Sequence, residues 1–271
     1  MLIIYSLYQF LWIFVIYAFF GWCLEVVYQA VELGKFINRG FLNGPYCPIY
    51  GFGVIIVAVS LNPLKENIIA LYVGSVVLTS ALELVTGFVL EKIFNQHWWD
   101  YSEEKFNIGG YICLKFSLLW GVACIVVVRL IHPSIEKFID WIPHGVGVII
   151  LTVICIGFAS DFIVTVMAIL KIKKKIKLLN DISAEMRKIS DKTGEKLFNG
   201  VENIREKSEE LNEKNAKRRK RMEELENKYR QIATNRSFTA KRIENAFPKL
   251  KIIHIKSLKE QIKEKIKNKN S

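Results

Sequence analysis

Long runs of apolar residues, separated by short polar stretches, fill the first 170 positions of the chain. A helix needs roughly 20 apolar residues to cross a bilayer core of about 30 Å. The runs therefore predict about five membrane spans, of which the second is short. These spans are Ile3–Gln29, Ile49–Leu61, Asn67–Ile93, Ile112–Ile131 and Val146–Leu170.

The run Ile49–Leu61 ends at Asn62-Pro63 and is too short for a regular span, so it predicts either a short crossing or a re-entrant hairpin. The first run has no Lys or Arg before it and no A-x-A cleavage pattern after it. Because it differs in this way from a secretory signal peptide, we expect it to remain in the mature protein.

A different pattern begins at Lys171, where apolar residues recur at alternating steps of three and four. This spacing is typical of a coiled-coil seam, here interrupted at Gly194 and Gly200. It fits both an antiparallel helical hairpin and a parallel dimer, and the dimer would make the protein self-associate. The seam positions are Leu179, Ile182, Met186, Ile189, Ile204, Leu211, Leu225 and Ile232.

The segment after Pro248 has a basic amphipathic pattern. Apolar residues such as Ile255 and Ile262 share one helical face, and lysines crowd the other faces. We expect residues 249–267 to lie on the anionic headgroups of the inner leaflet. No nucleic acid is expected as a partner, because a phosphate backbone would leave the apolar face uncovered.

Charge divides the chain at the same place. Residues 1–170 hold 8 basic and 11 acidic side chains, and residues 171–271 hold 30 and 15. The first part suits lipid, and the second has too little apolar surface for a globular core. The expected fold is all-α, with a membrane helix bundle over 1–170, a charged coiled-coil-like helical segment over 171–247 and a basic helix over 248–271. A soluble enzyme of one or two ordinary domains is excluded.

Basic residues in short loops predict the orientation, since they collect on the cytoplasmic side. They favour a multi-pass protein of the cell membrane with its N-terminus outside and its tail in the cytoplasm. The segment His132–His144 then becomes a short outer interfacial helix, with Pro133 and Pro143 as helix breaks and Trp141 at headgroup level. Expected inside are Lys35, Arg39, Lys92, Lys105 and Lys171–Lys177, and expected outside are Lys65, Arg129 and Lys137.

Cysteine and histidine spacing gives no sign of a metal centre. The five cysteines are widely spaced without a C-x-x-C pair, and the four histidines lack H-E-x-x-H spacing. We expect no disulfide framework, no metal and no cofactor.

Three carboxylates stand out among the ionisable side chains inside predicted spans, namely Glu25, Glu83 and Asp161. An ionisable side chain there is costly unless it is paired or hydrated, so each is a functional candidate. All three are on helices that run inward, which places them where they can line one cavity. The alternative is structural. Glu83 lies on a stripe of small and polar residues at steps of four, which suits helix packing and consists of Ser75, Thr79, Glu83, Gly87 and Glu91. Glu25 can reach the interface or pair with Arg39, and Asp161 can bond to a neighbouring helix.

Two inner loops add further candidates. Pro45 and Pro48 preclude a regular helix between them and predict an ordered loop in which Arg39 can hold a carboxylate or phosphate. In the second loop, Trp99-Asp100-Tyr101 is either an interfacial aromatic belt or part of a site for a headgroup or an organic cation. We expect Glu25, Arg39, Glu83 and Asp100 to meet in one cytoplasm-facing cavity.

An ordered series of motifs between residues 10 and 160 resembles the bacterial CmpB-like membrane proteins of the Putative ABC-transporter type IV family. The resemblance implies a transporter permease. The chain has no G-x-x-x-x-G-K-[ST] phosphate loop, so a separate ATPase subunit would be required. The motifs are Gly21-Trp22 with Glu25, Asn38-Arg39-Gly40, Gly44-Pro45-Tyr46-Cys47-Pro48-Ile49-Tyr50-Gly51, Trp99-Asp100-Tyr101-Ser102, Asn107, Gly110, Cys113-Leu114 and Trp120-Gly121.

Three functions remain in competition. A permease or substrate-binding membrane subunit ranks first, a membrane-embedded enzyme acting on a lipid or isoprenoid second, and a membrane-anchored scaffold third, since no diagnostic catalytic motif is present. The candidate substrate-binding residues are Glu25, Asn38, Arg39, Glu83, Trp99, Asp100, Tyr101 and Asp161.

Overall fold

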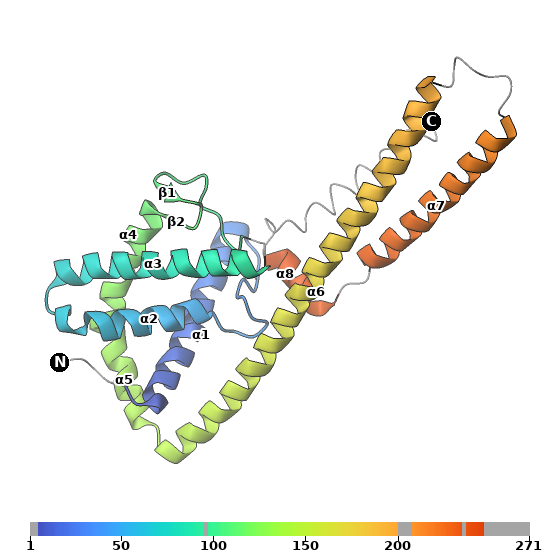
Figure 1. The fold of residues 1–271 in the computed structure, drawn as a ribbon. Coiled ribbons are helices and arrows are strands. Elements are labelled where there is room, and N and C mark those ends of the chain that lie inside the picture. Colours follow the sequence, from blue (N-terminus) through green and yellow to red (C-terminus); the bar gives the residue numbers. More distant parts are fainter. Residues whose placement is uncertain (1–4, 95–96, 200–207, 235–236, 247–271) are drawn as a thin grey trace. The chain divides into compact units, whose positions relative to one another are not determined.

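The computed structural model describes residues 5–94, 97–199, 208–234 and 237–246, and these form two compact units. The first unit contains the described residues up to Met167 together with those from Lys241 onward, and the second contains those from Ala168 to Ala240. Helices dominate both units (Figure 1). The predicted all-α class is therefore confirmed.

The first helix, α1 (Leu7–Leu33), begins at a capping box. The Gln9 amide donates a hydrogen bond to Ser6 Oγ at 3.3 Å, and the Ser6 amide donates to Gln9 Oε1 at 3.1 Å. These bonds satisfy donors that have no partner within the first turn. The helix ends at Gly34, whose φ of 64° lies in the left-handed region that glycine adopts without a Cβ clash.

The loop after α1 contains no helix until α2 (Pro48–Leu61), as the two prolines predicted. Pro48 is tolerated at the helix start because the amide that it lacks would have no intrahelical acceptor there. At 1.5 Å per residue, the 14 residues of α2 extend over about 21 Å. A 3₁₀ turn, η1 (Asn62–Leu64), then leads to α3 (Ile68–Phe94).

Two short strands, β1 (Asn107–Ile108) and β2 (Ile112–Cys113), pair antiparallel between α3 and α4 (Leu114–Val126). Sequence reasoning did not predict them. The turn between them uses Gly109 and Gly110, both with positive φ.

Helical backbone continues from α4 through a π-helical turn, η2 (Val127–Ile131), into α5 (His132–Trp141). The sequence predicts that Pro133 breaks the helix here, and this prediction was wrong. Proline has no amide to donate to the carbonyl of Arg129, and its ring crowds that carbonyl, so the widened turn before it accommodates the misfit without ending the helix.

The core of the first unit lies between α1, α2 and α5. Trp12, Ile13 and Tyr17 of α1 are buried in one cluster with Ile55 of α2 and Ile139 of α5. A second cluster joins the far end of α2 to α3 and η2, with Leu61, Leu71 and Val128 buried together. Packing of α1 and α5 on α2 therefore builds the frame that carries the polar residues described below.

The longest helix, α6 (His144–Asn199), continues without a break through Lys171 and Gly194. In the second unit it packs against α7 (Ser208–Thr234), with Leu179 and Ile182 buried beside Leu225 and Tyr229 of the same chain. This contact is an antiparallel hairpin. Coiled-coil packing and self-association stay predictions, and Ile204 and the segment 249–267 lie outside the described residues.

Within the described residues, four helical stretches are long and apolar enough to cross a membrane, and α2 with η1 forms a shorter apolar helix. The helix starts match the starts of the five predicted runs to within a few residues. Two ends do not match, because helical backbone continues from Ile131 to Trp141 and from Leu170 to Asn199. The number of crossings stays a prediction. The four long stretches are Leu7–Glu32, Ile68–Phe94, Leu114–Trp141 and His144–Ile189.

Candidate functional site

Glu25 of α1 accepts a hydrogen bond from the Tyr50 hydroxyl of α2, with 2.8 Å between Oε1 and the phenol oxygen. Tyr50 can approach this closely because Gly21 lies opposite it. A Cβ on Gly21 would come within 2.3 Å of the Tyr50 ring. The edge of the Trp120 ring covers Tyr50 from α4, with 5.6 Å between ring centroids.

Glu83 of α3 forms a matching pair with Tyr101, whose hydroxyl donates to Oε1 at 3.1 Å. The other oxygen, Oε2, is buried and has no hydrogen-bond partner among the described residues. Tyr101 stacks on Phe116 of α4, with 4.9 Å between ring centroids. Glu83 therefore presents one satisfied and one open carboxylate oxygen beside aromatic rings.

The two carboxylate–tyrosine pairs lie close enough to influence each other. Burial raises the pKa of the Tyr101 phenol above its usual value, and the charge and hydrogen bond of Glu83 and then the charge of Glu25 raise it further. Glu25, Tyr50, Glu83 and Tyr101 together are called the carboxylate cluster below.

The loop that carries Tyr101 is held by its own polar contacts. Trp99 Nε1 donates to the Tyr111 carbonyl at 2.8 Å. Asp100 Oδ1 accepts from the amide and the hydroxyl of Ser102, at 2.9 and 2.5 Å. The Tyr111 hydroxyl in turn donates to Glu91. Trp99 and Asp100 thus shape the turn that aims Tyr101 at Glu83.

The stripe of small and polar residues on α3 faces this same loop and α4. A Cβ on Gly87 would come within 2.8 Å of the Tyr111 ring and 3.1 Å of the Trp99 ring. Ser80, which lies next to the stripe, donates to Ser117 of α4 at 2.8 Å. The stripe therefore serves helix packing over part of its length and presents Glu83 to Tyr101 at its centre.

Asp161 of α6 organises the loop before α2. Its Oδ1 accepts from the amide and the side-chain Nδ2 of Asn43, at 3.1 and 2.7 Å, and its Oδ2 accepts from the Gly44 amide at 2.7 Å. The Thr165 hydroxyl donates to the same carboxylate at 3.1 Å. Three loop donors thus converge on one carboxylate that lies 118 positions further along the chain.

Asn38 closes the loop from the other side. Its Oδ1 accepts from Trp22 Nε1 at 2.9 Å and from the Gly40 amide at 3.1 Å, and its Nδ2 donates to the Asn43 carbonyl at 2.7 Å. Arg39 is partly exposed and makes no hydrogen bond or ion pair with the part of the chain that the structure describes. The residues 38–44 are called the clamp loop below.

Cys47 lies between the carboxylate cluster and the clamp loop. Its amide donates to the Ala18 carbonyl at 2.8 Å, and its side chain is buried. Burial and then the charge of Glu25 raise the pKa of the Cys47 thiol to about 12, while the charge of Arg242 lowers it. The sequence-predicted residues thus fall into two neighbouring groups, Glu25 with Glu83 and Tyr101, and Asn38 with Asp161.

Several polar residues of these groups were missed by sequence reasoning. The motif that contains Tyr50 predicts no role for its hydroxyl, and the position of Asn43 in a loop predicts no partner for its amide. Arg242 belongs to the charged tail, and no pattern in the sequence connects it to the clamp loop.

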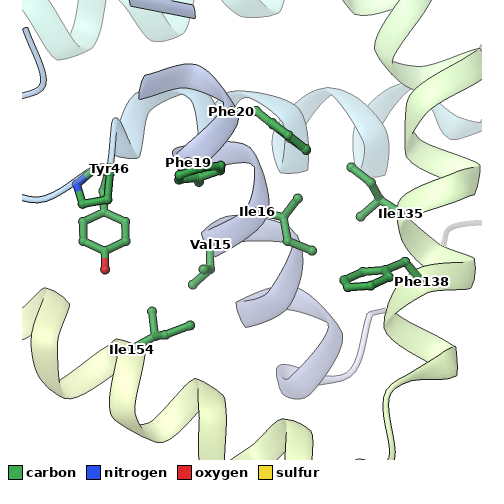
Figure 2. A pocket seen from close by; sticks show the side chains of 9 residues that line it. Val15, Ile16, Phe19, Phe20, Tyr46, Ile135, Phe138 and Ile154 are labelled. Atoms are coloured by element: carbon green, nitrogen blue, oxygen red, sulfur yellow. The ribbon is translucent and has the colours of Figure 1, made fainter. Parts of the chain in front are cut away.

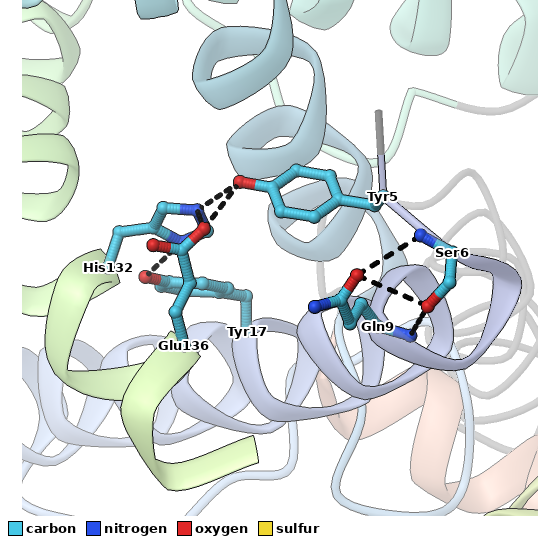
Figure 3. A network of polar contacts seen from close by, with 6 residues as sticks. All are labelled: Tyr5, Ser6, Gln9, Tyr17, His132 and Glu136. Carbon is cyan, nitrogen blue, oxygen red and sulfur yellow. Dashed lines mark hydrogen bonds and ion pairs between the residues drawn. The ribbon is translucent and has the colours of Figure 1, made fainter. Parts of the chain in front are cut away.

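A separate polar network lies at the start of α5 (Figure 3). The Tyr5 hydroxyl is 2.7 Å from His132 Nε2 and donates to Glu136 Oε1 at 3.0 Å, and the Tyr17 hydroxyl is 3.2 Å from His132 Nδ1. Burial, followed by the charge of Glu136, raises the pKa of Tyr5 above its usual value. The sequence does not predict this network, because Tyr5 and Tyr17 are far in sequence from His132 and Glu136.

A mainly apolar pocket of about 550 Å³ opens between α1, the loop before α2, α5 and α6 (Figure 2). Apart from the Tyr46 hydroxyl, its walls offer hydrocarbon and aromatic surface, so the chemistry suits an apolar group. The residues that line it are Val15, Ile16, Phe19, Phe20, Pro45, Tyr46, Ile135, Phe138 and Ile154.

Comparison with known families gives one match. The sequence model of the family described as Putative ABC-transporter type IV matches residues 12–166, which is more than half of the chain. This range includes the carboxylate cluster, the clamp loop and Asp161. No solved structure matches the chain significantly.

Proposed function

Because this chain belongs to the Putative ABC-transporter type IV family, we propose that it is the substrate-binding membrane subunit of a transporter in the bacterial cell membrane. The carboxylate cluster would bind a cationic group of the substrate. The observation that carries this proposal is the open, buried oxygen of Glu83 beside Glu25.

Physical chemistry supports a cation at this place. A buried carboxylate is costly unless it is paired, and Glu83 Oε2 lacks a partner among the described residues. A cationic group would supply that partner. The rings of Tyr50 and Tyr101 belong to the cluster, and the rings of Trp120 and Phe116 pack against them. Aromatic rings also attract cations.

The other candidate residues have supporting roles in this proposal. Trp99 and Asp100 hold the loop that carries Tyr101, and Asn38 and Asp161 hold the clamp loop. Arg39, partly exposed on that loop, offers a guanidinium to a carboxylate or phosphate of the same substrate.

Energy for transport would come from another chain. The sequence contains no phosphate loop of the G-x-x-x-x-G-K-[ST] type, so the proposed transporter needs a separate ATPase subunit. Purification in mild detergent, followed by mass spectrometry, should recover a chain with that motif in stoichiometric amount. Its absence from a stable, folded preparation would contradict the permease role without affecting the cation site.

The proposed topology has five spans, an outer N-terminus and a cytoplasmic tail. Arg242 contacts the clamp loop within the first unit, which supports a location of the loop and the tail on the same membrane side. That requires an even number of crossings between them, and α2, α3, α4 and α6 supply four if α2 crosses. A single cysteine at Ser134 should be labelled from outside intact cells. A single cysteine at Ser237 should be labelled only after permeabilisation. The reverse result would show that the orientation is inverted.

Cation binding is testable on the purified protein with tetramethylammonium chloride, using sodium chloride at equal ionic strength as the reference. We expect tetramethylammonium to raise the thermal unfolding temperature of the wild type and to leave that of Glu83→Gln unchanged. Glu91→Gln is the matched control, because Glu91 lies on the same stripe but is paired with Tyr111 and His97. Equal stabilisation of both variants, or none of the wild type, would contradict the proposed site.

A further inference from the structure

The guanidinium of Arg242, in α8 (Phe238–Ala246), contacts the clamp loop with all three of its nitrogens. Nε donates to Asn43 Oδ1 at 3.0 Å, and Nη2 donates to the Phe41 carbonyl at 3.0 Å. Nη1 donates to the Gly40 carbonyl at 2.8 Å and more weakly to the Asn38 carbonyl at 3.4 Å. Four oxygens of one short loop thus converge on one planar cation.

These acceptors are positioned by contacts that do not involve Arg242. Asn43 Nδ2 donates to Asp161 and to Thr165, and this fixes the amide so that its Oδ1 faces the guanidinium. On the opposite side, Trp22 and the Asn43 carbonyl hold Asn38. The site is therefore preorganised, with loop amides bound to Asp161 and loop carbonyls turned toward Arg242.

Arg242 is half-buried, whereas Arg219, Arg221 and Arg230 of the tail are exposed. Burial lowers the pKa of Arg242, and the charges of Asp161 and Cys47 oppose that shift. A charge removed from water at this cost must be compensated by hydrogen bonds. The four oxygen acceptors compensate for the water that Arg242 has lost. An arginine fully exposed to water would not need them.

Guanidinium is the cation that fits these acceptors. It carries five donors in a rigid planar fork, whereas an ammonium directs its three donors from a single point. The acceptor oxygens of the clamp loop bind Nε, Nη1 and Nη2 at the same time. This arrangement matches the planar guanidinium group and not the single nitrogen of an ammonium group.

We propose that the clamp loop is a guanidinium-binding site and that Arg242 occupies it as a tethered ligand. When α8 leaves, the same oxygens accept a free guanidinium-type cation. The site is distinct from the carboxylate cluster, and the inference does not depend on the proposed transport function.

Cys47 offers a native reporter of occupancy. It follows the clamp loop, its side chain is 6% exposed, and it lies within the electrostatic reach of Arg242. The test uses the full chain in detergent, with the other four cysteines replaced by alanine or serine, and measures the rate of Cys47 alkylation by N-ethylmaleimide. Arg242→Ala should raise that rate about tenfold, as expected for local opening of a loop that has lost a multidentate anchor.

The decisive experiment adds free guanidinium to the Arg242→Ala variant. Guanidinium chloride at concentrations well below denaturation should return the alkylation rate of Arg242→Ala toward the wild-type value. Methylammonium chloride at the same ionic strength should not. A rate in Arg242→Ala that is unchanged from wild type, or one that both salts or neither salt restores, would overturn the proposal.

Two further variants separate the site from general effects of the tail. Lys241→Ala, at the exposed neighbouring position, should alkylate at the wild-type rate. Arg242→Lys keeps the charge and helps if the alanine variant folds poorly. It should alkylate faster than wild type, because one ammonium cannot reach acceptors that three nitrogens share, and a wild-type rate in this variant would also overturn the proposal.

Discussion

Asp161 and Gly44 are joined by a 2.7 Å hydrogen bond from the Gly44 amide to Asp161 Oδ2. The bond ties the middle of α6 to the loop that leads into α2. Asn43 adds two further donors to the same carboxylate. A carboxylate that had looked like a candidate for substrate contact is therefore also an anchor for the backbone.

Removal of this anchor should destabilise the first unit. Asp161→Ala leaves three loop donors without their charged acceptor, and we expect a loss of about 3 kcal/mol in the free energy of unfolding. Thr152→Val in the same helix is the control, since its hydroxyl is exposed and bonds only to the Val148 carbonyl of its own helix. Thermal unfolding in detergent should show a large decrease for the first variant and almost none for the second.

The contact between Gly21 and Tyr50 should tolerate no added methyl group. In Gly21→Ala the new Cβ would lie 2.3 Å from the Tyr50 ring, so Tyr50 must move away from Glu25. Overpacking of this kind costs about 1–3 kcal/mol. Gly157→Ala in α6 places its Cβ in open space and should be neutral or stabilising. Equal unfolding temperatures for the two variants would show that α1 and α2 do not pack as described.

The alkylation of Cys47 should depend on pH differently from that of an ordinary cysteine. Its pKa is raised to about 12, chiefly by burial and then by Glu25, so the reactive thiolate is scarce at pH 8. Raising the pH from 7 to 9.5 should increase its alkylation without reaching a plateau, whereas an ordinary thiol levels off near its pKa.

The sign of the linked stability effect follows from the same shift. A raised pKa favours the neutral thiol in the folded state, so this contribution is complete below the unfolded pKa near 9 and is lost as the pH rises toward 12. Glu25→Gln removes the second cause and should speed alkylation at fixed pH. Mass spectrometry of the intact protein measures both rates, and an unchanged rate in Glu25→Gln would place Glu25 too far from Cys47 to act.

In the second unit, we expect a buried apolar side chain to contribute more to stability than an exposed ion pair. Leu179 is 2% exposed against α7, and Leu179→Ala should cost about 2–5 kcal/mol of local stability. Arg221 pairs with Glu185 at 2.9 Å, but both side chains are about half exposed, so Arg221→Ala should matter much less. Hydrogen exchange of α6 and α7 in the full chain distinguishes the two, and faster exchange in the Arg221 variant than in the Leu179 variant would reverse this ranking.

The local pattern of apolar and polar residues was sufficient to predict where the apolar helices lie in the sequence. Runs of apolar residues, with Pro48 at the start of α2 and the polar turn after Leu61, predicted where the five apolar helices begin to within a few residues, because every backbone polar group of a helix is satisfied within its own segment. They did not predict that α6 continues unbroken from the apolar run to Asn199. The strands β1 and β2 were missed, because two residues each are too few for a periodic signal. The family was also recognised from the order of the short motifs, and the comparison confirms it.

The sequence by itself determined which segments are helical and which carboxylates lie within apolar surroundings. Only the tertiary structure decided which partner each carboxylate has: Tyr50 for Glu25, Tyr101 for Glu83 and the clamp loop for Asp161. Arg242 shows the limit most clearly, since it lies about 200 positions from its acceptors and no periodicity relates them. Helix formation depends on neighbours in sequence, whereas a polar contact of this kind depends on how separate segments pack, and that choice is made by the fold as a whole.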